Sequence, residues 1–347
     1  MVLKRFLLKS FLVCASLLLT FALVELVFRI LDIRVHQPRK ETWKKALLPQ
    51  SQRIPGLIVQ FRPHSRFKII YDSNPDGYFD SDNSVSFRIN NYGFRGPDYG
   101  MKKPAGAKRI ILLGDSFVMG DGVREEDTLS SQLEKELRKD IPQAEVLNFG
   151  VSGWNTRSEI VYLGTVGLKF QPDLVIVVYV LNDAVFATGP PPDLRKEYQR
   201  TLGNSLLRQS RVADYLYTGV EKYFFSRRYL KALLDSPQQY EKAWSRTFEN
   251  LDTGSRITKG AGAKYVVCLF PFLYQLNDQY PLKPLHAYVR DHCSAAGIPF
   301  LDLLDAYQGQ NHVKLWVHPT DQHPNAMAHG IAARRLAEFI RGQQLLQ

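Results

Sequence analysis

Two residues far apart in the chain, Ser116 and His323, have the side-chain types that nucleophilic catalysis needs. Ser116 follows the apolar run Arg109 to Leu113 and comes directly after Gly114 and Asp115. His323 lies in the sequence Asp-Gln-His-Pro-Asn, more than two hundred residues later. A serine hydroxyl is a poor nucleophile at neutral pH unless a base such as histidine removes its proton during the attack. We therefore expect the fold to bring His323 to Ser116.

Four ordered sequence blocks resemble those of the SGNH (GDSL) hydrolase family, from about Arg109 to the C-terminus. The blocks are Gly114-Asp115-Ser116-Phe117, Asn148 to Gly153, Leu181-Asn182-Asp183 and Asp321 to Asn325. A Gly-Asp-Ser triplet alone also fits a strand-to-helix turn with a serine cap, so the order of all four blocks is what makes the resemblance specific. The resemblance implies a serine esterase, a carboxylic ester hydrolase that forms an acyl-serine intermediate and needs no metal or other cofactor.

The resemblance also implies roles for individual residues. Ser116 would be the nucleophile, and Asp115 a carboxylate that holds the turn. The oxyanion hole would consist of the backbone N–H groups of Ser116 and Gly153 and the side-chain amide of Asn182, with Gly150 as the alternative to Gly153. Each such donor is typically worth ~3 kcal/mol of transition-state stabilisation.

His323 would be the general base, and a carboxylate would fix its tautomer. The family pattern usually has an aspartate three residues before this histidine, but that position is Thr320, and Asp321 lies only two residues before. We choose Asp321, because some acetyl-handling members of the superfamily resemble this shorter form. Nearby residues of the same types are Asp302 and Asp305, expected to be structural, His318, the rival base, and His329, expected to be packed or capping.

Short apolar runs alternate with helical patterns from Arg109 onward. Strands are expected over residues 110–113, 146–149, 174–181, 265–270 and 298–301, and helices over 128–140, 155–169, 240–259, 285–296 and 325–340. This alternation predicts an α/β fold, with a parallel sheet and helices on both faces, as in the flavodoxin-like SGNH hydrolase fold. Reactive groups in such folds gather at the carboxyl ends of the strands. The blocks that carry Ser116, Gly153 and Asn182 fall there.

The region before this alternation is organised differently. Two alternating stretches, Arg66 to Tyr71 and Val85 to Ile89, enclose a loop rich in Asn, Asp, Gly and Ser, which predicts a β-hairpin, or small β-ribbon. The segment Asn91 to Gly96 resembles one that often precedes the GDS block in bacterial membrane-anchored SGNH proteins. Residues 31–60 are basic, contain prolines and show no strong period, so we interpret them as a tether.

The apolar run from Phe11 to Phe28 contains one charged residue, Glu25, and with its flanks approaches the ~20 residues that span a bilayer. No small-x-small cleavage site follows, which favours a retained signal anchor. Lysines and arginines flank the run on both sides, and the charge rule alone places the C-terminal part in the cytoplasm. The resemblance implies the opposite, and we follow it: a single-pass protein of the bacterial cytoplasmic membrane with a periplasmic catalytic domain.

Composition adds few constraints. The formal charge of the 347-residue chain is +11, but the basic residues are scattered and carry no nucleic-acid motif, so no nucleic-acid partner is expected. The three cysteines, at positions 14, 268 and 293, have no metal or redox spacing and are interpreted as buried thiols without a disulfide.

The expected organisation has four parts: a cytoplasmic N-terminus over 1–9, the transmembrane signal anchor over 10–30, a tether and β-ribbon over 31–105, and the hydrolase domain over 106–347, with a helical insertion at about 185–237. The expected partners are the membrane, through the N-terminal helix, and an ester substrate such as an O-acetylated envelope or secreted polysaccharide, or a lipid. Two alternatives remain. One is an O-acyltransferase that uses the same serine, and the other is a non-catalytic envelope scaffold, although a scaffold would not need the whole set of site residues.

Overall fold

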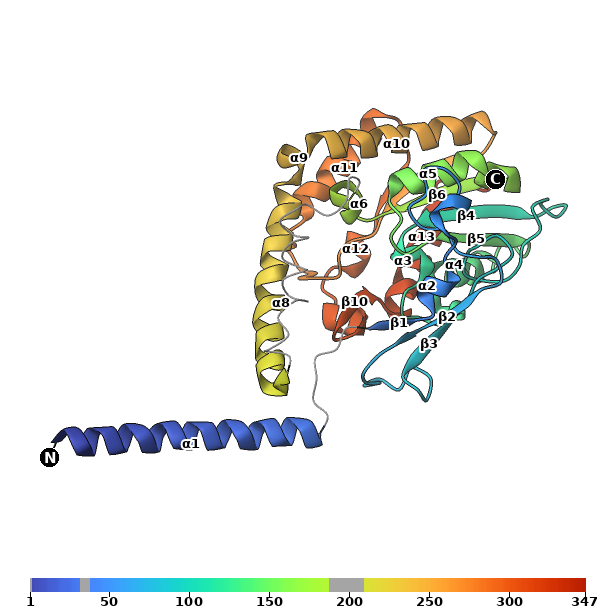
Figure 1. The fold of residues 1–347 in the computed structure, drawn as a ribbon. Helices are drawn as coiled ribbons and strands as arrows, with labels where there is room; N and C mark the ends of the chain where they lie inside the picture. The colour runs from blue at the N-terminus through green and yellow to red at the C-terminus, as the bar shows by residue number, and fades with distance from the viewer. Residues whose placement is uncertain (1, 32–37, 187–208) are drawn as a thin grey trace. The chain divides into compact units, whose positions relative to one another are not determined.

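The computed structural model describes residues 2–31, 38–186 and 209–347, which divide into two compact units (Figure 1). The larger unit comprises the described residues of 38–186 and 232–347. The smaller unit comprises residues 2–31 and 209–231.

A five-stranded parallel sheet forms the centre of the larger unit. Its strands lie in the order β5-β4-β6-β7-β8. They are β4 (Lys108–Gly114), β5 (Ala144–Gly150), β6 (Leu174–Tyr179), β7 (Lys264–Leu269) and β8 (Phe300–Asp302). Every residue of β6 is buried, because helices cover both faces of a parallel sheet. The predicted flavodoxin-like α/β fold is confirmed, and numbered along the chain its strands lie in the order 2-1-3-4-5, as in flavodoxin.

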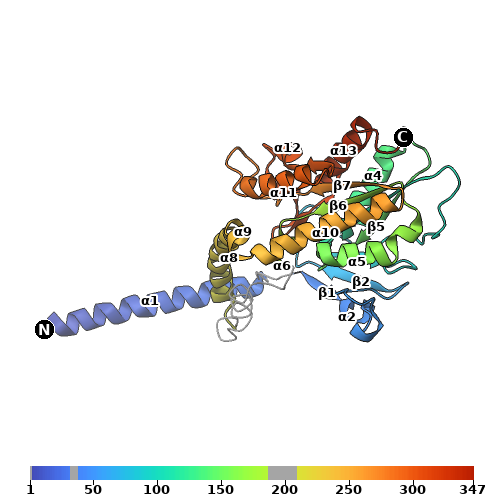
Figure 2. The same ribbon diagram turned by 90° about the horizontal axis from the view of Figure 1, so that it is seen from above.

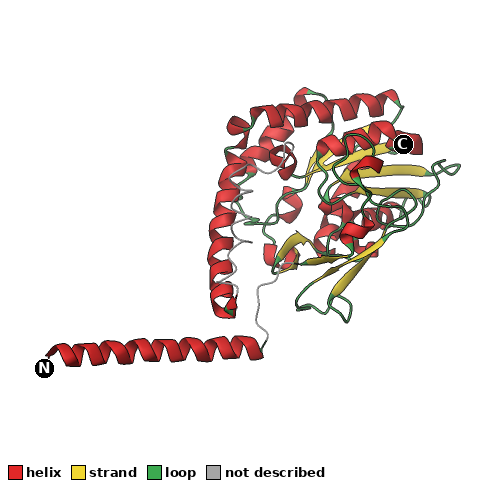
Figure 3. Cartoon of the chain, in the orientation of Figure 1, coloured by secondary structure: helices red, strands yellow, loops and turns green. Residues whose placement is uncertain are grey.

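Helices lie on both faces of this sheet (Figures 2 and 3). On one face α5 (Thr156–Thr165) packs against α10 (Glu241–Gly260), and on the other α4 (Leu129–Leu137) packs against α13 (Ala326–Gly342). α11 (Lys283–Ala295) lies beside β8. Three of these helices begin at a side-chain cap, since the oxygens of Thr128, Asn155 and Asn325 accept backbone N–H groups of the first turn. The helices therefore begin close to where the sequence predicts them.

A three-stranded antiparallel sheet precedes the main sheet in the chain. It consists of β1 (Arg39–Glu41), β2 (Arg66–Ile70) and β3 (Ser84–Arg88), in that order. The ring of Phe67 stacks on those of Phe61 and Phe87, at centroid distances of 5.5 Å and 4.5 Å. The β2–β3 hairpin agrees with the sequence-based expectation.

The predicted tether over residues 31–60 needs a correction. Its described part carries β1, the short helix α2 (Trp43–Ala46) and the 3-10 turn η1 (Gln50–Gln52). Ala46 and Leu57 are buried, so this segment packs as part of the larger unit. Elements of three or four residues are too short to produce a periodic pattern, which is why the sequence did not reveal them.

A second antiparallel pair, β9 (Trp316–His318) and β10 (Asp321–Pro324), lies just before α13. Its pairing is irregular between Asp321 and Pro324. The sequence did not predict this hairpin, and it matters because β10 contains His323.

The smaller unit contains α1 (Val2–Ile30) and all but the last turn of α8 (Arg211–Leu234). Residues 4–30 of α1 form a helix long enough and apolar enough to cross a membrane, a property that signal sequences share. Glu25 accepts hydrogen bonds from the hydroxyl of Ser210 and from the backbone N–H groups of Arg211 and Val212, so it caps the start of α8.

The structure describes only part of the predicted helical insertion, and it differs from the sequence-based expectation at one cysteine. Of the helical insertion predicted at about 185–237, residues 187–208 lie outside the described residues, and the described remainder is mainly helical. Cys268 and Cys293 are buried as expected, whereas Cys14 is exposed on α1.

Candidate active site

Ser116 lies at the carboxyl end of β4, as the first residue of the short helix α3 (Ser116–Met119). Asp115 caps this helix, because its Oδ1 accepts the N–H of Phe117 at 2.9 Å. A β-carbon on Gly114 would lie 2.4 Å from a side-chain atom of Val118, so only glycine permits this close packing of helix on strand. The turn therefore presents the Ser116 hydroxyl at a fixed place above the sheet.

The fold brings the predicted nucleophile, base and carboxylate together. Nε2 of His323 lies 2.9 Å from Oγ of Ser116, although 207 positions separate the two residues. Nδ1 of His323 lies 2.5 Å from Oδ1 of Asp321, and the same oxygen accepts the backbone N–H of His323 at 3.2 Å. Despite the two-residue spacing, Oδ1 of Asp321 therefore contacts both the ring nitrogen and the backbone nitrogen of His323.

Asp321 and His323 each favour the ionised form of the other. The Asp321 side chain is 11% exposed and that of His323 is 31% exposed. Burial raises the pKa of Asp321, but the positive charge of His323 and hydrogen bonds from His323 and Tyr71 outweigh it and lower this pKa to about 2. Burial lowers the pKa of His323, but the charge and hydrogen bond of Asp321 raise it to about 9. Asp321 therefore favours the imidazolium that forms when Ser116 gives up its proton.

This shift predicts the pH dependence of the reaction. A base must be neutral to accept a proton, and a histidine pKa above the ordinary 6.5 keeps His323 protonated to a higher pH. We expect kcat/KM for a neutral acetyl ester, measured from about pH 6 to about pH 10, to rise along one acid limb whose midpoint lies above 6.5 and toward 9. A plateau that is already complete at neutral pH would contradict this prediction.

Two of the rival residues, Asp302 and His318, have other hydrogen-bond partners, and the other two, His329 and Asp305, differ from the site residues in burial. Both carboxylate oxygens of Asp302 lie about 3 Å from Nδ1 of His286. His318 is buried and contacts the hydroxyls of Ser73 and Thr320. His329 is buried inside α13, where burial lowers its pKa to about 3. Asp305 is exposed on α12 (Leu304–Tyr307). The geometry favours His323 and Asp321 over all four.

Two glycines compete for the oxyanion hole, and their surroundings separate them. The N–H of Gly150 donates to Oδ1 of Asn148 at 2.9 Å, and a β-carbon on Gly150 would lie 2.3 Å from the backbone nitrogen of Met119. Gly153 is exposed and has a φ of +88°. A β-carbon there would make only an ordinary contact, at 3.8 Å from Cγ2 of Val59, and the Gly153 N–H donates to no described residue. Gly150 thus packs against α3, and Gly153 is the glycine whose N–H can reach a substrate.

Asn182 begins α6 (Asn182–Phe186) and lies near the nucleophile turn. Its Nδ2 donates to Oδ2 of Asp115 at 3.1 Å. Oδ1 of Asn182 is buried and has no hydrogen-bond partner among the described residues. The bond to Asp115 uses one of the two amide hydrogens and orients the group. Asp115 therefore holds both the nucleophile turn and the third predicted oxyanion donor.

Sequence reasoning missed a polar network beside the Gly153 turn. Oδ1 of the buried Asp121 accepts the hydroxyl of Ser152 at 2.6 Å, and its Oδ2 lies 2.6 Å from Nζ of Lys40 in β1. The network fixes Ser152, the neighbour of Gly153, and ties the small sheet to the loop after α3. Ser152 belongs to a recognised block, but nothing in the sequence links Lys40 to Asp121.

The segment Asn91 to Gly96, whose role the sequence left open, braces the same loop. The buried guanidinium of Arg95 donates to the backbone carbonyls of Met119, Gly120 and Val123. It also lies over the ring of Phe87, 3.9 Å from the ring centroid. Arg95 therefore holds the loop after the nucleophile helix against β3.

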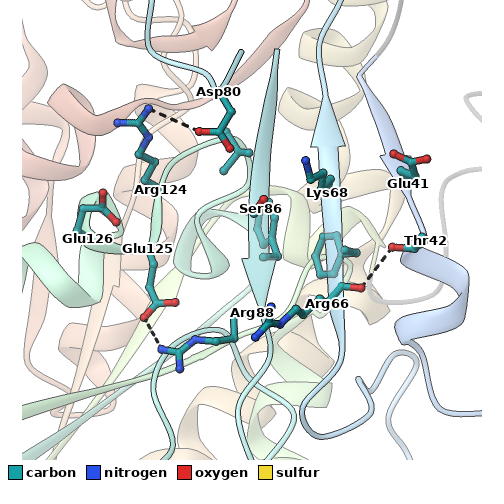
Figure 4. Close-up of a pocket in the computed structure, with 13 residues that line it drawn as sticks. Glu41, Thr42, Arg66, Lys68, Asp80, Ser86, Arg88, Arg124, Glu125 and Glu126 are labelled. Atoms are coloured by element: carbon teal, nitrogen blue, oxygen red, sulfur yellow. Dashed lines mark hydrogen bonds and ion pairs between the residues drawn. The ribbon is translucent and has the colours of Figure 1, made fainter. Parts of the chain in front are cut away.

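A cavity of about 630 Å³ lies on the outer side of the small sheet, and its lining contains neither Ser116 nor His323 (Figure 4). Charged side chains of the sheet and of the following loop pair across it, Asp80 with Arg124 at 3.8 Å and Arg88 with Glu125 at 3.2 Å. We interpret it as a seam of surface ion pairs. Among the described residues, no cluster of His, Cys, Asp and Glu could hold a metal ion.

A known protein family matches the part of the chain that contains this candidate site. The family model of the GDSL-like lipases and acylhydrolases matches residues 112–331, which is more than half of the chain. The chain therefore belongs to the GDSL-like lipase/acylhydrolase family, as the resemblance of its four blocks implied. It is accordingly an acyl-ester hydrolase by class. No curated protein matches the chain.

Several solved structures are similar to this chain at low sequence identity. A lipase/acylhydrolase from Enterococcus faecalis is 18% identical, with a TM-score of 0.41, over 68% of this chain and 96% of that one. The psychrotrophic esterase EstA from Pseudoalteromonas sp. is 14% identical, with a TM-score of 0.42, over 68% and 98%. A two-domain esterase active on acetylated mannans is 15% identical, with a TM-score of 0.43, over 68% and 49%. All three TM-scores lie below 0.5, so the family assignment rests on the sequence match.

Proposed function

We propose that this protein cleaves carboxylic esters through an acyl-Ser116 intermediate. The observation that carries the proposal is the continuous hydrogen-bonded line from Ser116 through His323 to Asp321. His323 Nε2 takes the proton of Ser116 as its Oγ attacks the ester carbonyl, and then passes that proton to the departing alkoxide oxygen. A water molecule, deprotonated by the same nitrogen, then attacks the acyl carbon. The bond from that carbon to Oγ breaks and Nε2 returns the proton to Oγ, which releases the acid and restores the serine.

The negative oxygen of the tetrahedral intermediate receives three N–H donors in this proposal. They are the backbone groups of Ser116 and Gly153, neither of which donates to a described residue, and the Asn182 amide. Donors that are already in place need no rearrangement during the reaction, and each is worth ~3 kcal/mol in comparable sites. Asn182 supplies its donor without a charge, which avoids the cost of desolvating one.

The substrate class we propose is an O-acetyl ester of an envelope or secreted polysaccharide. Its support is α1, which would hold the enzyme at a membrane and so beside the envelope. Esters of lipids fit the same four blocks. Exclusion of water by the insertion would favour the O-acyltransferase alternative, and residues 187–208 of that insertion lie outside the described residues. The hydrogen-bonded line through Ser116 argues against a non-catalytic scaffold, which would not need it.

Mass spectrometry of the full chain in detergent, after exposure to aryl acetates and to long-chain aryl esters, tests this function. We expect a mass increase of one acyl group, mapped to Ser116 and absent in Ser116→Ala. The ester that acylates Ser116 faster reveals the acyl preference. An adduct that is stable in buffer and is lost when an acetylatable sugar is added, with the acyl group appearing on the sugar, identifies the transferase. An unmodified protein that nevertheless hydrolyses the esters would refute the acyl-serine mechanism.

We also propose that α1 is a membrane anchor and that the hydrolase unit lies outside the cytoplasmic membrane. The family resemblance supports this orientation, whereas the larger number of lysines and arginines after the apolar run than before it opposes it. A C-terminal alkaline phosphatase fusion should therefore be active in cells, and a C-terminal fusion to a fluorescent protein that matures only in the cytoplasm should stay dark. The reverse pair of results would place the hydrolase unit in the cytoplasm.

A further inference from the structure

Tyr71 follows β2 in the small sheet, outside the residues that match the family model. Its side chain is almost completely buried, with 3% of the residue exposed. The ring stacks in parallel on that of Phe79, at a centroid distance of 4.3 Å, and its backbone N–H donates to the carbonyl of Asn83. The hairpin thus holds the tyrosine in one orientation.

The hydroxyl of Tyr71 reaches the carboxylate of the triad. It donates to Oδ2 of Asp321 at 2.8 Å, across 250 positions of sequence. The other oxygen, Oδ1, faces Nδ1 of His323. Each oxygen of Asp321 therefore has its own donor, and the carboxylate is clamped between the hairpin and the base.

Gly122 leaves room for the hydrogen bond between Tyr71 and Asp321. A β-carbon on Gly122 would lie 2.4 Å from the Tyr71 hydroxyl and 2.4 Å from a methyl group of Val317 in β9. Gly122 has a φ of +83°, and it belongs to the loop that Arg95 braces. Burial, together with the charge of Asp321, raises the pKa of the Tyr71 phenol far above its ordinary value, so the hydroxyl keeps its proton and remains a donor at every working pH.

We propose that Tyr71 is a positioning residue of the active site. Through Tyr71, the small N-terminal sheet helps to orient the catalytic carboxylate Asp321. The proposal rests on the proposed function and deepens it. Tyr71 does not touch the reacting atoms, and it acts through Asp321. Its hydroxyl fixes the plane of the carboxylate and shares its negative charge, and both effects decide how firmly and in which orientation Asp321 holds His323.

Removal of the Tyr71 hydroxyl should change both the pKa of His323 and kcat in a predictable direction. In Tyr71→Phe, Oδ2 of Asp321 loses its donor in a site that is 11% exposed, so more of the carboxylate charge acts on the imidazolium and the pKa of His323 rises. The carboxylate also gains freedom to rotate, which lowers kcat and leaves substrate binding unchanged. We expect kcat to fall about tenfold with little change in KM, the cost of one buried hydrogen bond.

The test uses the full chain in detergent and two readouts. One is the rate at which a fluorophosphonate probe labels Ser116 as a function of pH, which needs no knowledge of the substrate, and the other is turnover of an aryl acetate. In Tyr71→Phe the midpoint of the labelling profile should move up by about half a unit to one unit. Unchanged rates and an unchanged midpoint would overturn the proposal.

Tyr78→Phe is the matched control. Tyr78 lies in the same hairpin loop, and its hydroxyl donates to Asp127 at 2.6 Å, away from the triad. In the Tyr78→Phe variant, the probe should label Ser116 at the wild-type rate and with the wild-type pH midpoint, and turnover of the aryl acetate should be unchanged. A loss in Tyr78→Phe equal to that in Tyr71→Phe would reduce the role of Tyr71 to general support of the hairpin and overturn the proposal.

A second variant covers the case in which Tyr71→Phe fails to fold. Incorporation of 3-fluorotyrosine at position 71 keeps the ring and the hydroxyl but makes the hydroxyl a stronger donor, so the midpoint should move down, opposite to the change in Tyr71→Phe. A midpoint that stays in place or moves up would overturn the proposal.

The same experiments separate the role of Tyr71 from the proposed function. If Ser116 of the wild type is not labelled at all, the proposed function fails. If Ser116 is labelled while substitutions at position 71 have no effect, only the role of Tyr71 fails.

Discussion

Ser116→Ala and His323→Ala should each remove nearly all turnover of an acetyl ester, and the double variant should be little worse than either single one. Proton removal and attack belong to one step, and the two atoms involved lie 2.9 Å apart, so neither residue retains its effect without the other. We expect a loss in kcat of roughly 10⁴-fold to 10⁶-fold in each variant. The residual rate over water would come from the oxyanion donors and substrate binding.

Steady-state kinetics of the three purified variants, with melting temperatures to confirm that each is folded, provide the measurement. The activation free energies lost in the two single variants should not add in the double variant. EDTA should leave the wild type active, because the proposed steps use only side chains and backbone donors of the protein. Wild-type turnover in Ser116→Ala, or its loss on chelation, would rule out the serine mechanism.

Asp321→Asn should be the next most damaging change, with a loss in kcat on the order of 10³-fold to 10⁴-fold. An amide at this position donates where the carboxylate accepts, so it favours the wrong tautomer of His323 and no longer stabilises the imidazolium. The acid limb of the pH profile should also move toward lower pH, because the carboxylate that raises the pKa of His323 is gone.

Asp302→Asn is a close control for this change. Asp302 also pairs with a buried histidine, His286, at 2.9 Å, but that pair is not bonded to Ser116. We expect kcat within about twofold of the wild type, together with some loss of thermal stability from the weakened pair. Comparable activity of Asp321→Asn and the wild type, with a large loss in Asp302→Asn, would reverse the assignment of the carboxylate.

The sequence by itself determined the class of fold. The runs that became β4 and β6 are apolar on both alternating faces, as strands buried between two layers of helices must be. The amphipathic pattern of α10 and the capping residues of α4, α5 and α13 are also local signals, because a side chain that caps a helix or faces the core interacts within a few positions of itself.

Sequence blocks also identified the candidate site, but they left choices that only packing resolves. Gly150 and Gly153 lie three residues apart in the same sequence block. The tertiary structure separates them, because a β-carbon on Gly150 would lie 2.3 Å from the backbone nitrogen of Met119 in α3, whereas Gly153 is exposed. In the same way, the irregular β9–β10 hairpin turns His323 toward Ser116, while it turns His318 toward Ser73.

The contacts of the small sheet with the site could be found only in three dimensions. The bonds from Tyr71 to Asp321 and from Lys40 to Asp121 join residues 250 and 81 positions apart. No periodicity, cap or turn preference encodes such a pair, because local patterns report only what neighbours along the chain require. Which residues meet across the molecule depends on how complete elements pack, and that packing decides what holds the triad in place.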